Sequence, residues 1–511
     1  MRLKKTVLAA LTLMAAVSAH SNPVEATVAS LHAEIRAGKS CESITQSFLD
    51  RIAAYDQKGP KLKAILAVNQ QALDQARALD AQYKQDARVL DKLFCVPVIA
   101  KDNFDVAGMP TTGANVSMKD SMPNDDAFAI RKMKEAGAII LAKSNLMEFA
   151  RGGTTVSSLG GQTLNPYDLT RTPGGSSGGS GVAMAASYGV LSTGSDTGQS
   201  IRSPASAHSL VGVRPTRGLI SRDGVMPNSF TQDEIGPITR TVSDAARMLD
   251  AIVAFDPADP ITALGVGKTP KSYLDALDKD ALRGARVGLL VDTLGDQERH
   301  APVNTVMKDT VEKMKALGAT VVEVRIPGYK ELTSQTSTDQ MEARDAFNFY
   351  FKTLPANAPV RDFDQLVALK QAHPAIQKAL EAEAAVQNGM NSDRYKTRTL
   401  NREKLRIALA AAMAENKVDA LLYPLQSVLV APIGNHSQPE RNGVLSNGTG
   451  FPAVTFPAGF SEPSQTARLG VPVGAELLAL DYTEPKLLSY AFAFEQAYKP
   501  RKAPVLTPPL K

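Results

Sequence analysis

Several residue types are scarce in this chain of 511 residues, and each scarcity narrows the possible functions. Tryptophan is absent and aromatic residues make up 5% of the chain, so the sequence gives no strong hint of a platform on which a substrate would stack. The two cysteines and six histidines form no clustered ligand set, and there is no His-Glu-x-x-His motif, so we predict neither a metal nor an organic cofactor. Beyond the N-terminus, no apolar run reaches the roughly 20 residues that a membrane span needs.

The N-terminal residues have the pattern of an export signal. Arg2, Lys4 and Lys5 precede an apolar stretch over residues 6–17, and Val17-Ser18-Ala19 fits cleavage after Ala19. We therefore expect residues 1–19 to be a signal peptide and the protein to be periplasmic or secreted. The alternative is an N-terminal membrane anchor. Without the three basic residues the net charge of +5 falls to about +2, which favours neither a nucleic-acid partner nor an anionic membrane.

The two cysteines, Cys41 and Cys95, allow two interpretations. In an oxidising compartment they form a disulfide that closes a long loop, and otherwise they are two buried thiols. The sequence does not choose between them. No histidine neighbours either residue, so neither is predicted to be a nucleophile.

Strand and helix signals alternate along the chain. Residues 96–100, 138–142 and 190–193 are typical of buried strands, whereas 23–38, 181–188 and 303–317 have helical signals. We predict an α/β fold, one compact domain over residues 20–511, with a mixed, mostly parallel sheet covered by helices on both faces. Residues 330–415 are polar and mostly helical, and we expect them to form a substrate-specific region beside the sheet.

Two serine-rich runs and one lysine carry the chemistry of the sequence. Ser176 lies in the run from Gly174 to Ser180, and Ser200 ends a second run that begins at Gly194. Lys101 follows a predicted buried strand, where burial would favour its neutral form. A serine needs a base to become a nucleophile, and a neutral lysine can serve. An ion pair between Lys101 and Asp102 is the alternative interpretation.

The first serine run has other interpretations as well. It resembles a flexible linker in composition, but it lies between folded segments. It lacks the Gly-Lys-Ser/Thr ending of a phosphate-binding loop. Gly174 to Gly178 matches the G-x-S-x-G nucleophile elbow, which would require a strand directly before it and a catalytic histidine. The preceding residues 165–173 read as a loop, and none of the six histidines lies in a shared motif.

Motifs along nearly the whole mature chain, residues 25–505, resemble the amidase signature family. They are residues 97–103, 142–149, 174–180, 194–204, 213–216, 450–459 and 472–478. The resemblance implies a Ser–cis-Ser–Lys triad, with Ser200 as nucleophile, Ser176 as the proton bridge and Lys101 as base. It also implies an oxyanion hole formed by the backbone N–H groups of Thr197, Gly198, Gln199 and Ser200.

One position departs from the family pattern, because the residue before the nucleophile is Gln199 where glycine is usual. The backbone donor remains, but the freedom to adopt a positive φ is lost. Asp196 and Arg202 flank the same segment, and we expect them to brace it through charge-assisted hydrogen bonds. For Glu148, which lies in another matching motif, we likewise predict a structural role.

The sequence thus predicts an exported serine amidase that hydrolyses a small-molecule carboxamide to a carboxylate plus ammonia or an amine. An esterase or carbamate hydrolase with the same triad is the first alternative. Two further alternatives are a non-catalytic binding protein on the same fold and an amidotransferase-type subunit. The substrate and the oligomeric state are not predicted.

Overall fold

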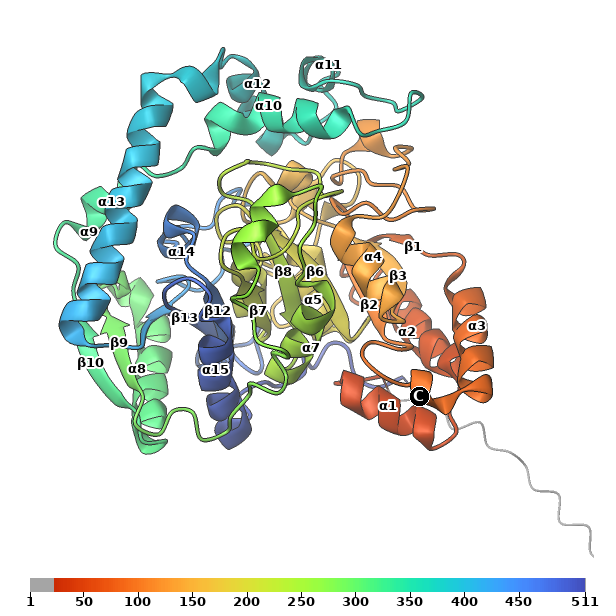
Figure 1. Cartoon of the computed structure of the whole chain (residues 1–511), viewed down its shortest axis with the longest axis horizontal. Helices are drawn as coiled ribbons and strands as arrows, with labels where there is room; N and C mark the ends of the chain where they lie inside the picture. Colours follow the sequence, from red (N-terminus) through yellow and green to blue (C-terminus); the bar gives the residue numbers. More distant parts are fainter. Residues whose placement is uncertain (1–22, 511) are drawn as a thin grey trace, which may run out of the picture.

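The computed structural model describes residues 23–510, so the expected signal peptide and its cleavage site lie outside the described residues. Within that range an 11-stranded sheet forms the centre of the molecule, in the order β1-β3-β2-β6-β8-β7-β12-β13-β11-β9-β10 (Figure 1). Its strands are β1 (Ile65–Val68), β2 (Pro97–Lys101), β3 (Ile139–Ser144), β6 (Leu191–Asp196), β7 (Val211–Arg214), β8 (Glu234–Thr239), β9 (Arg286–Leu290), β10 (Thr320–Val324), β11 (Ala420–Pro424), β12 (Ala453–Phe460) and β13 (Pro472–Leu478). A small hairpin pairs β4 (Val156–Ser157) with β5 (Gly161–Gln162).

The helices surround this sheet (Figure 1). They are α1 (Val28–Arg36), α2 (Cys41–Tyr55), α3 (Ala72–Gln85), α4 (Phe128–Glu135), α5 (Gly178–Ala185), α6 (Arg202–Ala207), α7 (Val242–Ile252), α8 (Ala301–Ala316), α9 (Tyr329–Ser334), α10 (Asp339–Phe351), α11 (Phe363–Ala368), α12 (Pro374–Ala384), α13 (Asp393–Asn416), α14 (Val444–Thr449) and α15 (Glu484–Tyr498). The α/β class and the single compact domain are therefore confirmed. Among the described helices, none is long and apolar enough to cross a membrane.

The sheet is mixed, but the expected predominance of parallel strands is wrong. Parallel pairs join β2 with β3 and β6, and β9 with β10 and β11. The other pairings of the large sheet are antiparallel, including β12 with β13. The reason lies in the connections: β12 and β13 are joined by only residues 461–471, and a short connection between neighbouring strands gives an antiparallel pair.

Three predicted boundaries shift for identifiable reasons. The first helix begins at Val28 rather than Pro23, because Thr27 caps it and accepts a hydrogen bond from Ser30 N. Helix α5 begins at Gly178, inside the glycine–serine run, rather than at residue 181. A Cβ atom on Gly179 would lie 2.2 Å from the Asn145 carbonyl oxygen, so close packing requires glycine in this helix. Strand β6 extends beyond residue 193 to Asp196, which brings Ser195 into the sheet.

The region 330–415 is largely helical, as expected. In Figure 1, α10, α11 and α12 form an arch above the strands at the centre of the sheet, and the long α13 descends beside it. Glu342 on α10 binds the loop before β8: it accepts hydrogen bonds from Thr231 N (3.1 Å), Thr231 Oγ1 (2.7 Å) and Ser229 Oγ. The arch is thus attached to the loop that leads into the central sheet.

Candidate active site

The candidate site lies where β2 and β6 end. These strands are parallel neighbours, with Val98 opposite Leu191 and Ile99 opposite Ser192. Because carboxyl ends of parallel strands meet at one edge, Lys101 at the end of β2 comes beside Ser195 near the end of β6. The Nζ atom of Lys101 lies 2.7 Å from Ser195 Oγ and 2.8 Å from Ser176 Oγ.

The Lys101 side chain is fully buried and has no carboxylate within ion-pair distance in the described part of the chain. Burial lowers the pKa of Lys101 to about 7, although the charges of Asp196 and Asp233 oppose this shift. The expected alternative, an ion pair with Asp102, is absent there, since Asp102 pairs with Lys143 at 3.0 Å. The neighbouring carboxylate thus has its own cation, and Lys101 is available as a neutral amine near pH 7.

Ser176 is held in a buried loop between β5 and α5. The Gly175–Ser176 peptide bond is cis. The Ser176 carbonyl accepts a hydrogen bond from Met147 N at 2.9 Å, and the Gly174 carbonyl accepts one from Thr155 Oγ1 at 2.7 Å. No strand precedes the run, because residues 172–174 have no regular structure, and the nucleophile-elbow interpretation is therefore wrong.

Ser200 lies on the turn that follows β6. Its carbonyl oxygen accepts a hydrogen bond from Ser177 N at 3.1 Å, so the two serine runs are in direct contact. The side chain is mostly buried, with 6% of its surface exposed, and the residue lines a cavity. The structure therefore brings together all three residues to which the resemblance assigns the triad.

The carbonyl groups of this turn all point into the protein. Thr197 O accepts from Gln232 Nε2 (3.1 Å), and Gly198 O accepts from Arg202 Nη2 (2.7 Å) and Asn447 Nδ2 (2.8 Å). Gln199 O accepts from Ser203 N at 2.7 Å. In the described residues, by contrast, the backbone N–H groups of residues 197–200 have no protein acceptor. Four unpaired donors on one turn form a site that can stabilise an oxyanion.

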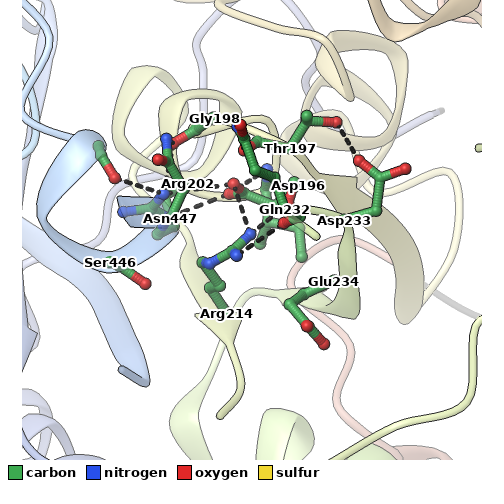
Figure 2. A network of polar contacts seen from close by, with 12 residues as sticks. Asp196, Thr197, Gly198, Arg202, Arg214, Gln232, Asp233, Glu234, Ser446 and Asn447 are labelled. Carbon is green, nitrogen blue, oxygen red and sulfur yellow. Dashed lines mark hydrogen bonds and ion pairs between the residues drawn. The ribbon is translucent and has the colours of Figure 1, made fainter. Parts of the chain in front are cut away.

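The donors to these carbonyls belong to a buried charge network (Figure 2). Asp196 pairs with Arg202 at 3.0 Å and with Arg214 at 3.1 Å, and Arg202 also pairs with Glu476 at 2.8 Å. Burial alone would raise the pKa of Asp196, but the charges of Arg202 and Arg214 outweigh burial and lower it to about 2. The geometry supports the expected bracing role of Asp196 and Arg202. Arg202 donates a hydrogen bond to the Gly198 carbonyl of the turn, and Asp196 holds Arg202 through an ion pair.

Gln199 fits this turn without strain, since neither Gly198 nor Gln199 has a positive φ. The glycine that is usual before the nucleophile is therefore not needed here for its backbone freedom. Glu148 is also structural, because it accepts hydrogen bonds from Ser158 Oγ at 2.7 Å and His373 N at 2.7 Å. His208 is fully buried, and burial lowers its pKa to about 3.

Three residues of the site were not predicted as site residues from the sequence. Ser195 contacts Lys101, Asn103 Nδ2 donates to Ser195 Oγ at 3.1 Å, and Asp233 accepts from Thr197 Oγ1 at 2.5 Å. The position of Ser195 within the second serine run was an available signal. Asp233 precedes β8, a strand that the sequence did not predict, so its proximity to the turn required the antiparallel pairing of β6 with β8.

Two cavities meet at this turn and share Ala150, Thr197 and Asn228. The first, which we call the apolar cavity, measures about 240 Å³, and its lining includes Ser195 and the apolar or aromatic residues Val225, Met226, Phe230, Ile235, Phe349 and Tyr350. The second, the polar cavity, measures about 400 Å³ and is lined by residues that include Arg151, Gln199, Ser200, Asp339, Glu383 and Arg441. In the described residues, no group of His, Cys, Asp and Glu side chains is arranged to hold a metal ion.

Comparison with known proteins gives a consistent result. Residues 43–488 match the family model described as Amidase. The chain is 33% identical to a glutamyl-tRNA(Gln) amidotransferase subunit of Gloeothece citriformis, with 94% of this chain and 99% of the relative covered. The crystal structure of native peptide amidase from Stenotrophomonas maltophilia matches with a TM-score of 0.85 and 34% identity, covering 94% of this chain and 99% of that one. The corresponding amidotransferase subunit from Thermotoga maritima matches with a TM-score of 0.70 and 26% identity, covering 93% and 95%.

Proposed function

The chain belongs to the amidase family, the enzymes of which act on amides, and we propose that it hydrolyses a carboxamide through an acyl-enzyme on Ser200. The observation that carries this proposal is the environment of Lys101. Its amine is buried, has no carboxylate partner among the described residues, has a pKa of about 7 and lies 2.8 Å from Ser176 Oγ.

The proposed reaction begins with proton transfer. Neutral Lys101 accepts the hydroxyl proton of Ser176, which accepts that of Ser200, and the Ser200 oxygen attacks the amide carbon. The N–H groups of residues 197–200 stabilise the oxyanion. The proton returns through Ser176 to the leaving nitrogen as the carbon–nitrogen bond breaks, which releases ammonia or an amine. Water then attacks the acyl-enzyme, and the carboxylate product leaves.

Ser195 has a supporting role in this scheme. A neutral amine has one lone pair and two N–H bonds, so Lys101 can accept from Ser176 while it donates to Ser195. Asn103 Nδ2 also donates to Ser195 Oγ, which fixes the position of that hydroxyl. Ser195 thereby aims the lone pair of Lys101 at Ser176.

Labelling with a fluorophosphonate, followed by peptide mapping, tests the proposal. We expect an adduct on Ser200 that is lost in Lys101→Ala, with Phe255→Ala, an exposed position outside both cavities, as the control variant. An adduct on Ser176 that survives Lys101→Ala would contradict the scheme. Matched ester and amide substrates then test the esterase alternative, since both reactions share the acyl-enzyme.

We also propose that the protein is exported and acts without partner subunits. The Cys41–Cys95 disulfide, with a Cα–Cα distance of 5.7 Å, supports export because disulfides persist in oxidising compartments. The relatives named as amidotransferase subunits favour the alternative, in which the chain works within a complex. N-terminal sequencing of protein from a periplasmic fraction tests export: a mature chain beginning at His20 is expected. Gel filtration of that protein tests for partners.

A further inference from the structure

We propose that the apolar cavity binds an aromatic group of the amide substrate and that Phe349 is a residue that determines this specificity. The inference rests on the proposed function, because it takes the amide to be cleaved at the turn carrying Ser200. The cavity reaches that turn directly: Thr197 and Ser195 line it, and Ser195 Oγ lies 2.7 Å from Lys101 Nζ.

Several polar side chains in the wall of this cavity are already bonded within the protein. Arg222 pairs with Asp259 through two hydrogen bonds, of 2.9 and 3.0 Å. Tyr350 donates its hydroxyl to Asp105 at 2.7 Å. Asp233 accepts from Thr197 Oγ1 (2.5 Å), Asn228 N (2.6 Å) and Ser229 N (2.8 Å). Because these groups are bonded within the protein and several apolar side chains line the same space, the cavity offers a ligand chiefly apolar surface. Asn103 Oδ1, which has no partner among the described residues, is a polar point in its wall.

The outer end of the cavity has an exposed aromatic side chain. Phe349 on α10 is 63% exposed, and its ring packs edge to face on Phe230, with centroids 6.0 Å apart and planes at 78°. Both rings line the cavity, so an incoming ring can extend the pair in the geometry that aromatic groups prefer. Two neighbouring aromatic rings in the wall of a cavity that also has Ser195 in its lining are suited to bind an apolar ligand beside the candidate site.

The size of the cavity agrees with this occupant. A cavity of roughly 150 Å³ is sufficient to bind benzene. The volume of about 240 Å³ therefore accepts one ring with a short linker to the reacting amide. The polar cavity on the other side of the turn has Arg151, Glu383 and Arg441 in its wall, and more of its surface is polar than apolar. The aromatic group and the rest of the substrate thus occupy different cavities.

Three amides test the proposal: acetamide, phenylacetamide with the ring on the acyl side, and N-benzylacetamide with the ring on the amine side. We expect kcat/KM for at least one phenyl compound to exceed that of acetamide about 10-fold or more, by the contribution of apolar contacts in a pocket. Phe349→Ala should remove most of this difference, because kcat/KM should fall far more for the phenyl amide than for acetamide. Phe255→Ala, an exposed phenylalanine outside both cavities, should change neither value. Equal rates for all three amides, or equal losses for all three in Phe349→Ala, would overturn the proposal.

A binding measurement separates this inference from the proposed function. Since the chain has no tryptophan, Phe349→Trp introduces a single tryptophan reporter in the wall of the apolar cavity. Titration with the phenyl amides should shift its emission, whereas acetamide should not, even if no amide is hydrolysed. Absence of a shift with both phenyl amides would overturn the inference, whereas fluorophosphonate labelling of Ser200 decides the proposed function independently.

Discussion

At the scale of the residue, two buried lysines that lie close together differ in their partners: one faces a carboxylate and the other does not. Lys143 faces the Asp102 carboxylate at 3.0 Å and donates to Pro110 O at 2.8 Å. Lys101 faces two hydroxyl groups and no carboxylate in the described chain. Sequence reasoning identified Lys101 but could not assign the partner of Asp102. Lys101 and Lys143 lie near the ends of neighbouring strands, and only the side-chain packing shows which of them pairs with the carboxylate.

Stability measurements should separate these lysines. Lys143→Met leaves Asp102 buried without a cation and should lower the free energy of unfolding by about 3–5 kcal/mol. Lys101→Met leaves no charge unpaired, so its loss of stability should be clearly smaller. Urea unfolding of both variants at pH 8 makes the comparison. A larger loss in Lys101→Met would mean that Lys101 has a carboxylate partner in solution.

The pKa of Lys101 also predicts a pH dependence. Burial lowers this pKa to about 7, and only the neutral amine can accept a proton, so the rate of labelling at Ser200 should rise as the pH increases from 5 and level off above about 7. His208, whose pKa burial lowers to about 3, is neutral throughout this range and cannot produce such a profile. The test is to quench the labelling reaction at several times, at each pH between 5 and 9, and to measure the rate at Ser200. A rate that falls with increasing pH would contradict the role of Lys101 as base.

At the scale of the element, the arch of helices and the loop before β8 form one unit. Glu342 on α10 accepts from Ser229 and Thr231 of the loop and from Tyr395 Oη of α13 at 3.0 Å. The helical character of residues 330–415 was predictable from their composition. The attachment of α10 to the loop was not, because it depends on β8, which carries glycine and proline within its strand and so lacks a strand pattern.

A conservative substitution tests this attachment. Glu342→Gln replaces one acceptor oxygen by a donor, so the loop should lose part of its support, with a decrease of about 2 kcal/mol in the free energy of unfolding and a higher KM. The matched control is Asp345→Asn, an exposed position on the same helix. Steady-state kinetics and urea unfolding on both variants give the result. Equal behaviour of the two variants would show that Glu342 does not position the loop.

At the scale of the whole molecule, the fold class and the serine–lysine constellation could be predicted from sequence, because each depends on contiguous motifs. The order of strands could not, since β7 pairs with β12, which lies far away in the chain. The choice between a disulfide and two thiols was also beyond the sequence. The structure joins Cys41, at the start of α2, to Cys95, just before β2, with a separation of 54 residues.

This disulfide should contribute to stability. Closing a loop of 54 residues stabilises the folded state by about 4 kcal/mol in the chain-entropy model. The double variant Cys41→Ser/Cys95→Ser should lose about this amount, while Ser200 still reacts with the fluorophosphonate under conditions where the protein is folded. Unfolding with and without reductant is the measurement. Reductant should lower the free energy of unfolding of the wild type and leave that of the double variant unchanged. A decrease in both would mean that the effect of the reductant does not come from this disulfide.

The turn after β6 also has a consequence for how the protein acquires its activity. Two of its carbonyl groups accept hydrogen bonds from the side chains of Gln232 and Asn447, so segments far apart in the chain must meet before the N–H groups are aligned. Contacts of such long sequence separation form late, because the chain must first close large loops. During refolding, reactivity at Ser200 should therefore recover after the circular dichroism of the helices. Catalytic activity therefore requires that the whole chain has folded, and a partly folded fragment should have none.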